Sequence, residues 1–288
     1  MFTIGADIEV FLSKDGELTS AIGVVHGTKD EPIYVKKEIG LSYDNVAAEF
    51  TVPVAHSVDE FVDGITEAYA ALLKYLPNEY TVKILPSADF PVSQLNSRWA
   101  WEFGCDADYN VWTMEENKTE CEKDSTLRTC GGHVHVGHEL LTQDEPRWMM
   151  VRMMDYTLGA FSALFDSSEE ALKRRQLYGK PGCYRKTDYG VEYRTLSNFW
   201  TQNSTLMRAV YHLTEDALYL VKEDNFIDLL MAVNPDNMQE MILQGDDDTA
   251  LHYIEQVLWD KLSQDTREVL DVLIQERKKG TENAARVS

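Results

Sequence analysis

The chain has 288 residues, and 44% of them are apolar, which is enough to form a sizeable buried core. It carries 49 acidic and 27 basic residues, giving a net charge of −22. This balance argues against nucleic acid or an anionic membrane surface as a partner, because both require Lys and Arg. It is compatible with divalent cations, which need carboxylate ligands. No apolar run approaches the about 20 residues of a membrane helix.

The N-terminus and the cysteines both indicate a cytoplasmic protein. Residues 1–5 lead straight into strand-like sequence and lack the basic region and cleavage site of a signal peptide. The four cysteines, Cys105, Cys121, Cys130 and Cys183, show no CxxC spacing. A chain of this size does not need disulfide bonds for stability. We therefore expect reduced thiols.

The first 55 residues are predicted to form strands. Alternating residues indicate one strand over 2–12, followed by a turn at 14–16, and another over 45–54. Glu49 falls in the middle of the latter strand, where a charged side chain needs a partner or solvent. We therefore expect Glu49 either to have a partner or to reach solvent.

A helix is predicted to follow. Ser57 can cap it, Glu60 completes a capping box, and apolar residues recur at helical spacing until position 76. A short strand is expected over 80–86. Residues 97–130 are rich in turn-forming residues, and so long a connection is more often functional than not.

The rest of the chain predicts an α+β fold. The elements expected in order are a strand over 128–137, a helix over 144–165, a basic, Gly-rich loop over 167–190, a strand over 189–197, and helices over 206–220 and 248–277. We expect residues 1–202 to form a catalytic antiparallel sheet with inserted helices. Residues 203–288 would form a helical part packed on the same domain.

Three strands share one pattern. Residues two apart in a strand point to the same face. Each of these strands therefore presents two charged or metal-binding groups on one side: Asp7 with Glu9, His133 with His135, and Glu192 with Arg194. Glu49, on another strand, can converge on the same face. Sites rich in carboxylate oxygen suit Mg²⁺ or Mn²⁺, so the pattern predicts a metal site.

The basic segment predicts phosphate binding. Guanidinium groups match phosphate in bidentate geometry. The residues expected to hold a nucleotide triphosphate are Arg174, Arg175, Lys180, Arg185 and Arg194. The glycines would allow the loop to close.

Each motif is also compatible with a different role. His-x-His occurs in zinc hydrolases, Glu-x-Arg can be a salt bridge within a strand, and an Asp-x-Glu pair can lie on an exposed edge. A zinc hydrolase needs further His or Cys ligands, and the remaining histidines fall in no motif. The chain has no HExxH, Walker A or kinase signature. A metal-dependent hydrolase, a phosphotransferase and an inactive binding protein remain as alternatives.

Four motifs in order carry a family resemblance: GADIEVF, NVAAEFTVP, GGHVHVG and GVEYRTLSNFW. They resemble the phage-type carboxylate–amine ligases (COOH–NH2 ligase, type 2) of the glutamine synthetase and glutamate–cysteine ligase superfamily, over residues 1 to about 220. The resemblance implies a curved antiparallel sheet that floors an active-site funnel. It also implies that ATP phosphorylates a carboxylate and that an amine then attacks the acyl phosphate, with Mg²⁺ or Mn²⁺ present.

The resemblance assigns roles to individual residues. The metal ligands it implies are Asp7, Glu9, Glu49, His133 and Glu192. It places His135 near the nucleotide and Arg194 at the transferring phosphoryl group. Arg175 and Arg185 match the upstream phosphate arginines.

The chain also departs from the family. Asp7 stands where many relatives have Glu, and Asp44 or Asp106 could add a ligand. No glutamate or ammonium pocket is recognisable. The substrates are therefore left as a small-molecule or peptide carboxylate and amine. A homo-oligomer and a phage-encoded protein in a host cytoplasm are both compatible with the sequence.

Overall fold

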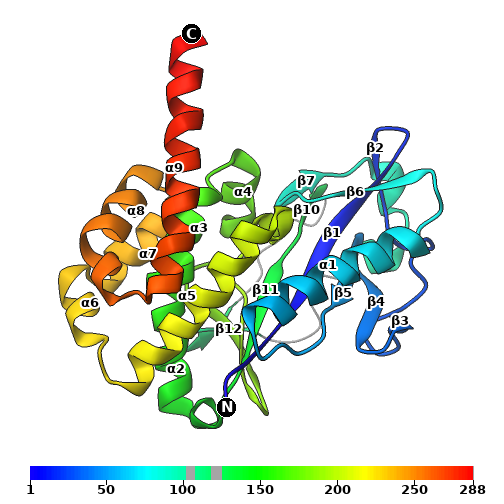
Figure 1. Ribbon diagram of the computed structural model, residues 1–288. Helices are drawn as coiled ribbons and strands as arrows, with labels where there is room; N and C mark the ends of the chain where they lie inside the picture. Colours follow the sequence, from blue (N-terminus) through cyan, green and yellow to red (C-terminus); the bar gives the residue numbers. More distant parts are fainter. Residues whose placement is uncertain (102–107, 118–124, 288) are drawn as a thin grey trace.

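The computed structural model describes residues 1–101, 108–117 and 125–287, with side chains as far as residue 280 (Figure 1). Its strands are β1 (Thr3–Lys14), β2 (Glu17–Thr19), β3 (Ile33–Lys36), β4 (Ile39–Asp44), β5 (Ala47–Thr51), β6 (Tyr80–Lys83), β7 (Ser87–Asp89), β8 (Tyr109–Asn110), β9 (Glu115–Glu116), β10 (Leu127–Thr129), β11 (Gly132–Gly137), β12 (Cys183–Thr187) and β13 (Gly190–Tyr193). Its α-helices are α1 (Val58–Tyr75), α2 (Asp144–Met154), α3 (Ala160–Phe165), α4 (Glu169–Leu177), α5 (Ser204–Lys222), α6 (Ile227–Ala232), α7 (Pro235–Gln244), α8 (Asp247–Tyr253) and α9 (Gln264–Val287).

The strands pair in antiparallel fashion around the long strand β1. The main sheet runs β3-β4-β5-β1-β11-β13-β12-β8-β9, with β2 and β6 paired to the far end of β1. Strands β7 and β10 form a separate two-stranded sheet. The α+β class with an antiparallel sheet is thus confirmed. None of the helices in the described part of the chain is both long and apolar enough to cross a bilayer.

One face of the main sheet is apolar and supports the core. Ile8, Val10, Phe50, Val134 and Val136 are fully buried and belong to one apolar cluster. Helices α1 and α5 pack against each other, and α1 lies along the sheet (Figure 1). The same cluster includes side chains from both predicted segments of the chain. The division after residue 202 itself stays a prediction.

Local sequence signals position two helices as expected. The Ser57 side chain accepts a hydrogen bond from the Glu60 amide, so α1 begins where the capping box predicts. The helix expected over 144–165 is present as α2 and α3, joined by a π-helical turn over Asp155–Gly159. The buried Asp155 carboxylate accepts hydrogen bonds at 2.6 Å from both Trp112 and Tyr193. This turn therefore ties the helix to β13.

The prediction of a basic loop over 167–190 is wrong. The segment forms helix α4 and strand β12, joined by a turn in which Gly179 and Gly182 take positive φ values. Ser168 caps α4 by accepting from the Ala171 amide at 3.2 Å. The density of charge and glycine suggested a phosphate-binding loop, but Arg174 and Arg175 are buried and donate to backbone carbonyls.

Two other predicted elements are interrupted. The strand expected over 128–137 divides into β10 and β11, which belong to different sheets. At the break, a side chain on Gly131 would meet the ring of His133, with Cβ 2.3 Å from Nε2. The helical region expected over 248–277 divides at Leu262, whose backbone is extended. Ser263 then accepts from the Thr266 amide as the chain turns into α9.

Candidate active site

The strand register collects the predicted residues on the polar face of the sheet. The pairs of Cα partners are Asp7 with His133, Glu9 with Glu49, His135 with Glu192, and Glu192 with Arg185. Partners on adjacent strands share a face, as do residues two apart in one strand. The polar side chains predicted from single strands therefore form one continuous surface over five strands.

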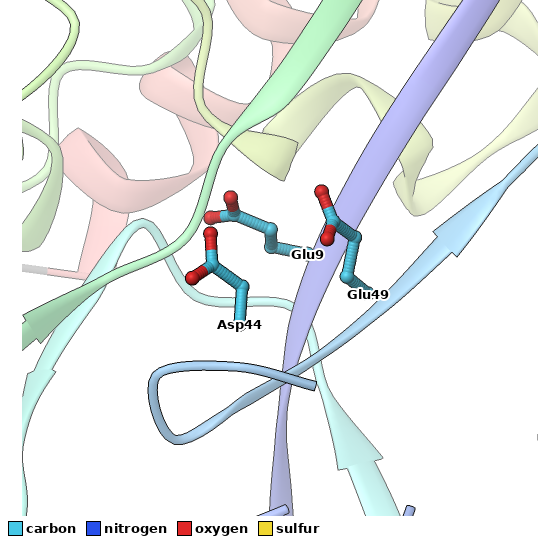
Figure 2. A group of neighbouring side chains, drawn as sticks. All are labelled: Glu9, Asp44 and Glu49. Carbon is cyan, nitrogen blue, oxygen red and sulfur yellow. The ribbon is translucent and has the colours of Figure 1, made fainter. Parts of the chain in front are cut away.

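Three carboxylates meet at one end of this surface. Glu9, Asp44 and Glu49 each offer an oxygen, and these oxygens lie within 4.8 Å of one another (Figure 2). Burial, followed by repulsion from Asp44, raises the pKa of Glu9. Burial also raises the pKa of Glu49 well above its usual value, although Lys29 opposes the shift. The positive charge near these three carboxylates is thus too small to balance their negative charge.

Backbone and side-chain donors fix two of these carboxylates. The Gly131 amide donates to Glu9 Oε2 at 2.6 Å, and the Ser42 hydroxyl donates to Glu49 Oε2 at 3.3 Å. The break between β10 and β11 places the Gly131 amide where it can make this contact. In Glu9 and in Glu49, the other carboxylate oxygen accepts from neither of these donors. A metal ligand requires such an oxygen.

A second cluster surrounds Glu192 and is rich in positive charge. The Glu192 carboxylate forms ion pairs with Arg194 and, at 3.2 Å, with Arg185, and it lies 3.4 Å from His133 Nδ1. Arg194 Nε also lies 3.5 Å from Asp108 Oδ2. Burial, and then Arg194, lowers the pKa of His133 well below its usual value. A neutral imidazole beside a carboxylate can accept a metal ion.

A third group lies beside the second. The His135 Nε2 atom is 3.0 Å from Asp7 Oδ2, and His135 Nδ1 is 2.6 Å from the Tyr189 hydroxyl. Burial alone would raise the pKa of Asp7 and lower that of His135, but their contact reverses both shifts. The hollow beside this group is also lined by apolar Val52 and Val54.

The first two clusters open into a common recess. Its lining residues include Glu9, Lys29, Asp44, His133, Arg174, Arg185 and Arg194. The five predicted metal ligands are therefore divided among three groups of residues. Glu9 and Glu49 join Asp44, His133 and Glu192 join Arg194, and Asp7 contacts His135.

The predicted phosphate residues divide in the same way. Arg174 lines the recess, and its Nη1 donates to the Thr195 carbonyl at 2.7 Å. Arg175 instead donates to the Ser162 and Asp166 carbonyls at 3.0 and 2.8 Å, outside the residues that line the recess. Lys180 lines a different hollow, on the side of α7. The structure thus brings Arg174, Arg185 and Arg194 to the recess, but not Arg175 or Lys180.

Other residues at the site were missed or left open by the sequence. Asp44 was one of two possible additional ligands, and the other, Asp106, lies outside the described residues. Lys29 and Asp108 were missed because neither lies in a recognisable sequence motif. Cys130 and Cys183 are buried, and burial raises the pKa of Cys183 to about 12. A thiol with so high a pKa is a poor nucleophile.

The donor chemistry fits a hard cation better than zinc. Among the described residues, the group of three or more ligands that could hold a metal consists of carboxylates alone. Such a set suits Mg²⁺ or Mn²⁺, whereas zinc sites are mostly built from His and Cys. This composition disfavours the zinc hydrolase.

Solved structures of other proteins resemble this chain in fold. The chain aligns with a bifunctional glutathione synthetase from Pasteurella multocida with a TM-score of 0.51 and 11% identity, covering 96% of this chain and 48% of that one. It thus spans about half of that protein's length. Two further solved structures, a GmaS/ADP complex and a novel glutamine synthase homolog, give TM-scores of 0.42 and 0.39, with 10% and 12% identity. The alignments cover 98% and 94% of this chain, and 70% of each of the other two.

The fold and the acid-lined recess define the class as an α+β protein whose antiparallel sheet carries a site of carboxylates and arginines. Residues 126–277, more than half of the chain, match the model of the phage phiEco32-like COOH.NH2 ligase-type 2 family. The chain belongs to this carboxylate–amine ligase family. The matched region includes the His133 and Glu192 strands but not β1. No curated protein matches the chain.

Proposed function

We propose that the chain is an ATP-dependent carboxylate–amine ligase that requires Mg²⁺ or Mn²⁺ and forms an amide through an acyl phosphate. The observation that carries this proposal is the shared recess, in which Glu9 and Asp44 of the carboxylate cluster line the same hollow as Arg174 and Arg194. Phosphoryl transfer from ATP needs oxygen ligands for a divalent cation and positive groups around the phosphates.

The proposed reaction has two steps. A carboxylate oxygen of the substrate takes the γ-phosphoryl group of ATP, which gives an acyl phosphate and ADP. The amine nitrogen then attacks the acyl carbon, the bond from that carbon to the phosphate oxygen breaks, and the amine gives up a proton. The products are an amide, ADP and inorganic phosphate.

The residues of the two clusters have distinct proposed roles. Glu9, Asp44 and Glu49 would hold one cation, and His133 with Glu192 would contribute to holding another. A bound divalent cation would neutralise charge on the phosphate oxygens. These assignments follow from the donor types and from the burial of the groups.

The arginines would bind the phosphates and substrate carboxylate. Arg194 is held between Glu192 and Asp108, so its guanidinium is oriented before substrates bind. Arg174 lines the recess, and its buried Nε atom has no hydrogen-bond partner among the described residues. A buried donor of this kind favours an anionic ligand.

The hollow beside His135 would take the nucleoside. Tyr189 offers an aromatic ring there, and Val52 and Val54 offer apolar surface. A nucleobase has an apolar face and polar edges, which such a mixture suits.

The test is a screen of small carboxylates, amines and peptides with ATP and Mn²⁺, monitored by ADP release and by mass spectrometry of the products. We expect an amide together with equal amounts of ADP and phosphate. A stable phosphorylated product without an amide would favour a phosphotransferase. Stoichiometric zinc with no affinity for ATP would favour a hydrolase. Failure to bind ATP in the presence of Mg²⁺ would overturn the proposal.

A further inference from the structure

A lysine already lies at the carboxylate cluster. Lys29 Nζ is 2.6 Å from Asp44 Oδ2, and it lines the same recess as Glu9. Burial would lower the pKa of Lys29, but attraction from Glu49 and Asp44 raises it above its usual value. The ammonium group is therefore charged, and it interacts with the acids that would bind a metal.

The fold holds the segment that carries Lys29. This segment connects β2 to β3 and passes close to β4 at Gly27. A Cβ on Gly27 would lie 2.0 Å from the Leu41 carbonyl oxygen, so only glycine allows this approach. The Gly27 carbonyl accepts a hydrogen bond from the Tyr43 amide at 3.0 Å, one residue before Asp44. The lysine is thus anchored next to its partner.

A short turn completes the attachment. The Thr28 hydroxyl accepts a hydrogen bond from the Glu31 amide at 3.1 Å, and the Thr28 amide donates to the Glu31 carbonyl at the same distance. These two bonds enclose Lys29 within the turn. Hydrogen bonds of the residues on both sides of Lys29 therefore hold the segment that carries it beside Asp44.

An ammonium and a divalent cation compete for the same oxygens. An ammonium group has no lone pair, so Lys29 cannot be a metal ligand. Its positive charge would also repel a metal bound a few ångströms away. The Lys29 side chain is 35% exposed, so it can turn towards solvent without unfolding of the sheet.

We propose that Lys29 is a tethered cation that occupies the Glu9, Asp44 and Glu49 cluster when no metal is bound, and that the divalent metal displaces it from Asp44. This inference rests on the metal site of the proposed function. Lys29 is then a positioning residue that sets the metal affinity. It stabilises the acids in the metal-free protein and weakens metal binding by competition.

The test measures Mn²⁺ binding to the full chain by isothermal titration calorimetry and electron paramagnetic resonance, without nucleotide. In Lys29→Met we expect the Kd for Mn²⁺ to fall about tenfold or more, because a repelling charge is removed from a partly buried site. The Tm of the metal-free protein should fall. Lys29→Arg keeps the positive charge and should therefore bind Mn²⁺ more weakly than Lys29→Met does. Lys14→Met is the matched control, since Lys14 forms an exposed pair with Glu79 at 3.5 Å.

A second measurement uses the wild-type protein and does not depend on the folding of a variant. Acetylation of lysine amines, followed by mass spectrometry, should be faster at Lys29 when Mn²⁺ is present and unchanged at Lys14. Unchanged or slower acetylation of Lys29, or unchanged or weaker Mn²⁺ binding in a folded Lys29→Met, overturns the inference. If neither wild type nor Lys29→Met binds Mn²⁺, the metal site of the proposed function fails as well.

Discussion

Glu9 and Glu49 lie directly opposite each other on the antiparallel strands β1 and β5, and both carboxyl groups are buried on the same face. Like charges in directly opposed positions destabilise a sheet. The chain therefore carries an electrostatic cost at the centre of its main sheet. Lys29 offsets part of this cost, and a divalent cation would offset more.

Replacing Glu49 with Gln is expected to stabilise the metal-free protein. Burial raises the pKa of Glu49 well above its usual value, so the folded state is penalised for carrying the charge, and a neutral amide removes the penalty. In EDTA, calorimetry should show the Tm rise by about 2–5 °C. Binding of Mn²⁺ should be lost. Glu79→Gln, on the exposed surface, should change neither quantity, and a lower Tm for Glu49→Gln would contradict the assignment.

The stability of the metal-free protein should depend on pH at this same group. A carboxyl group with a raised pKa binds more protons in the folded state than in the unfolded state. Its contribution to the free energy of unfolding is therefore full below the ordinary value of 4.5 and is lost as the pH rises through the raised pKa. Urea denaturation in EDTA from about pH 5 to pH 8 should show the wild type losing stability relative to Glu49→Gln as pH rises. A constant difference between the two proteins would count against a raised pKa at Glu49.

Arg194→Lys should reduce turnover while preserving the fold. The substitution keeps the positive charge beside Glu192 but removes the planar fork that contacts both Glu192 and Asp108. We expect kcat for ADP release to fall about 100-fold or more, and the Tm to change by only a few degrees. Arg208→Lys, at an exposed pair with Asp59, is the control. Retention of normal kcat in Arg194→Lys would remove Arg194 from the proposed mechanism.

Arg175→Met should act on the fold instead of the reaction. Arg175 donates to two buried carbonyl groups, and Asp166 Oδ2 lies 3.7 Å away. Removing a buried, paired charge typically costs about 3 kcal/mol or more. Urea denaturation should show this loss, while the affinity of the folded protein for ATP stays unchanged. A specific loss of ATP affinity would instead support the phosphate-binding role that the sequence suggested for Arg175.

The sequence predicted those parts of the site that depend on neighbours along the chain. Alternation within single strands was sufficient to place His133 and His135 on one face of their strand, and Asp7 and Glu9 on one face of theirs. The direction of successive side chains is a local property of a strand. The capping residue Ser57 was identifiable because a helix cap also depends on residues that are close in the sequence. The order of the four motifs led to the family, which the match over residues 126–277 confirms.

Tertiary structure decided which of these groups meet. The pairing of β1 with β5 brings Glu9 to Glu49, and a segment anchored at Gly27 brings Lys29 to Asp44. Such contacts depend on strand register and loop docking between distant segments, which no local pattern encodes. Arg175 shows the same limit, since its sequence neighbours suggest a phosphate site while its actual partners are backbone carbonyls. The sequence by itself determined the chemical groups available and the faces of the strands they occupy. Only the packing of remote segments decided which of those groups share a recess.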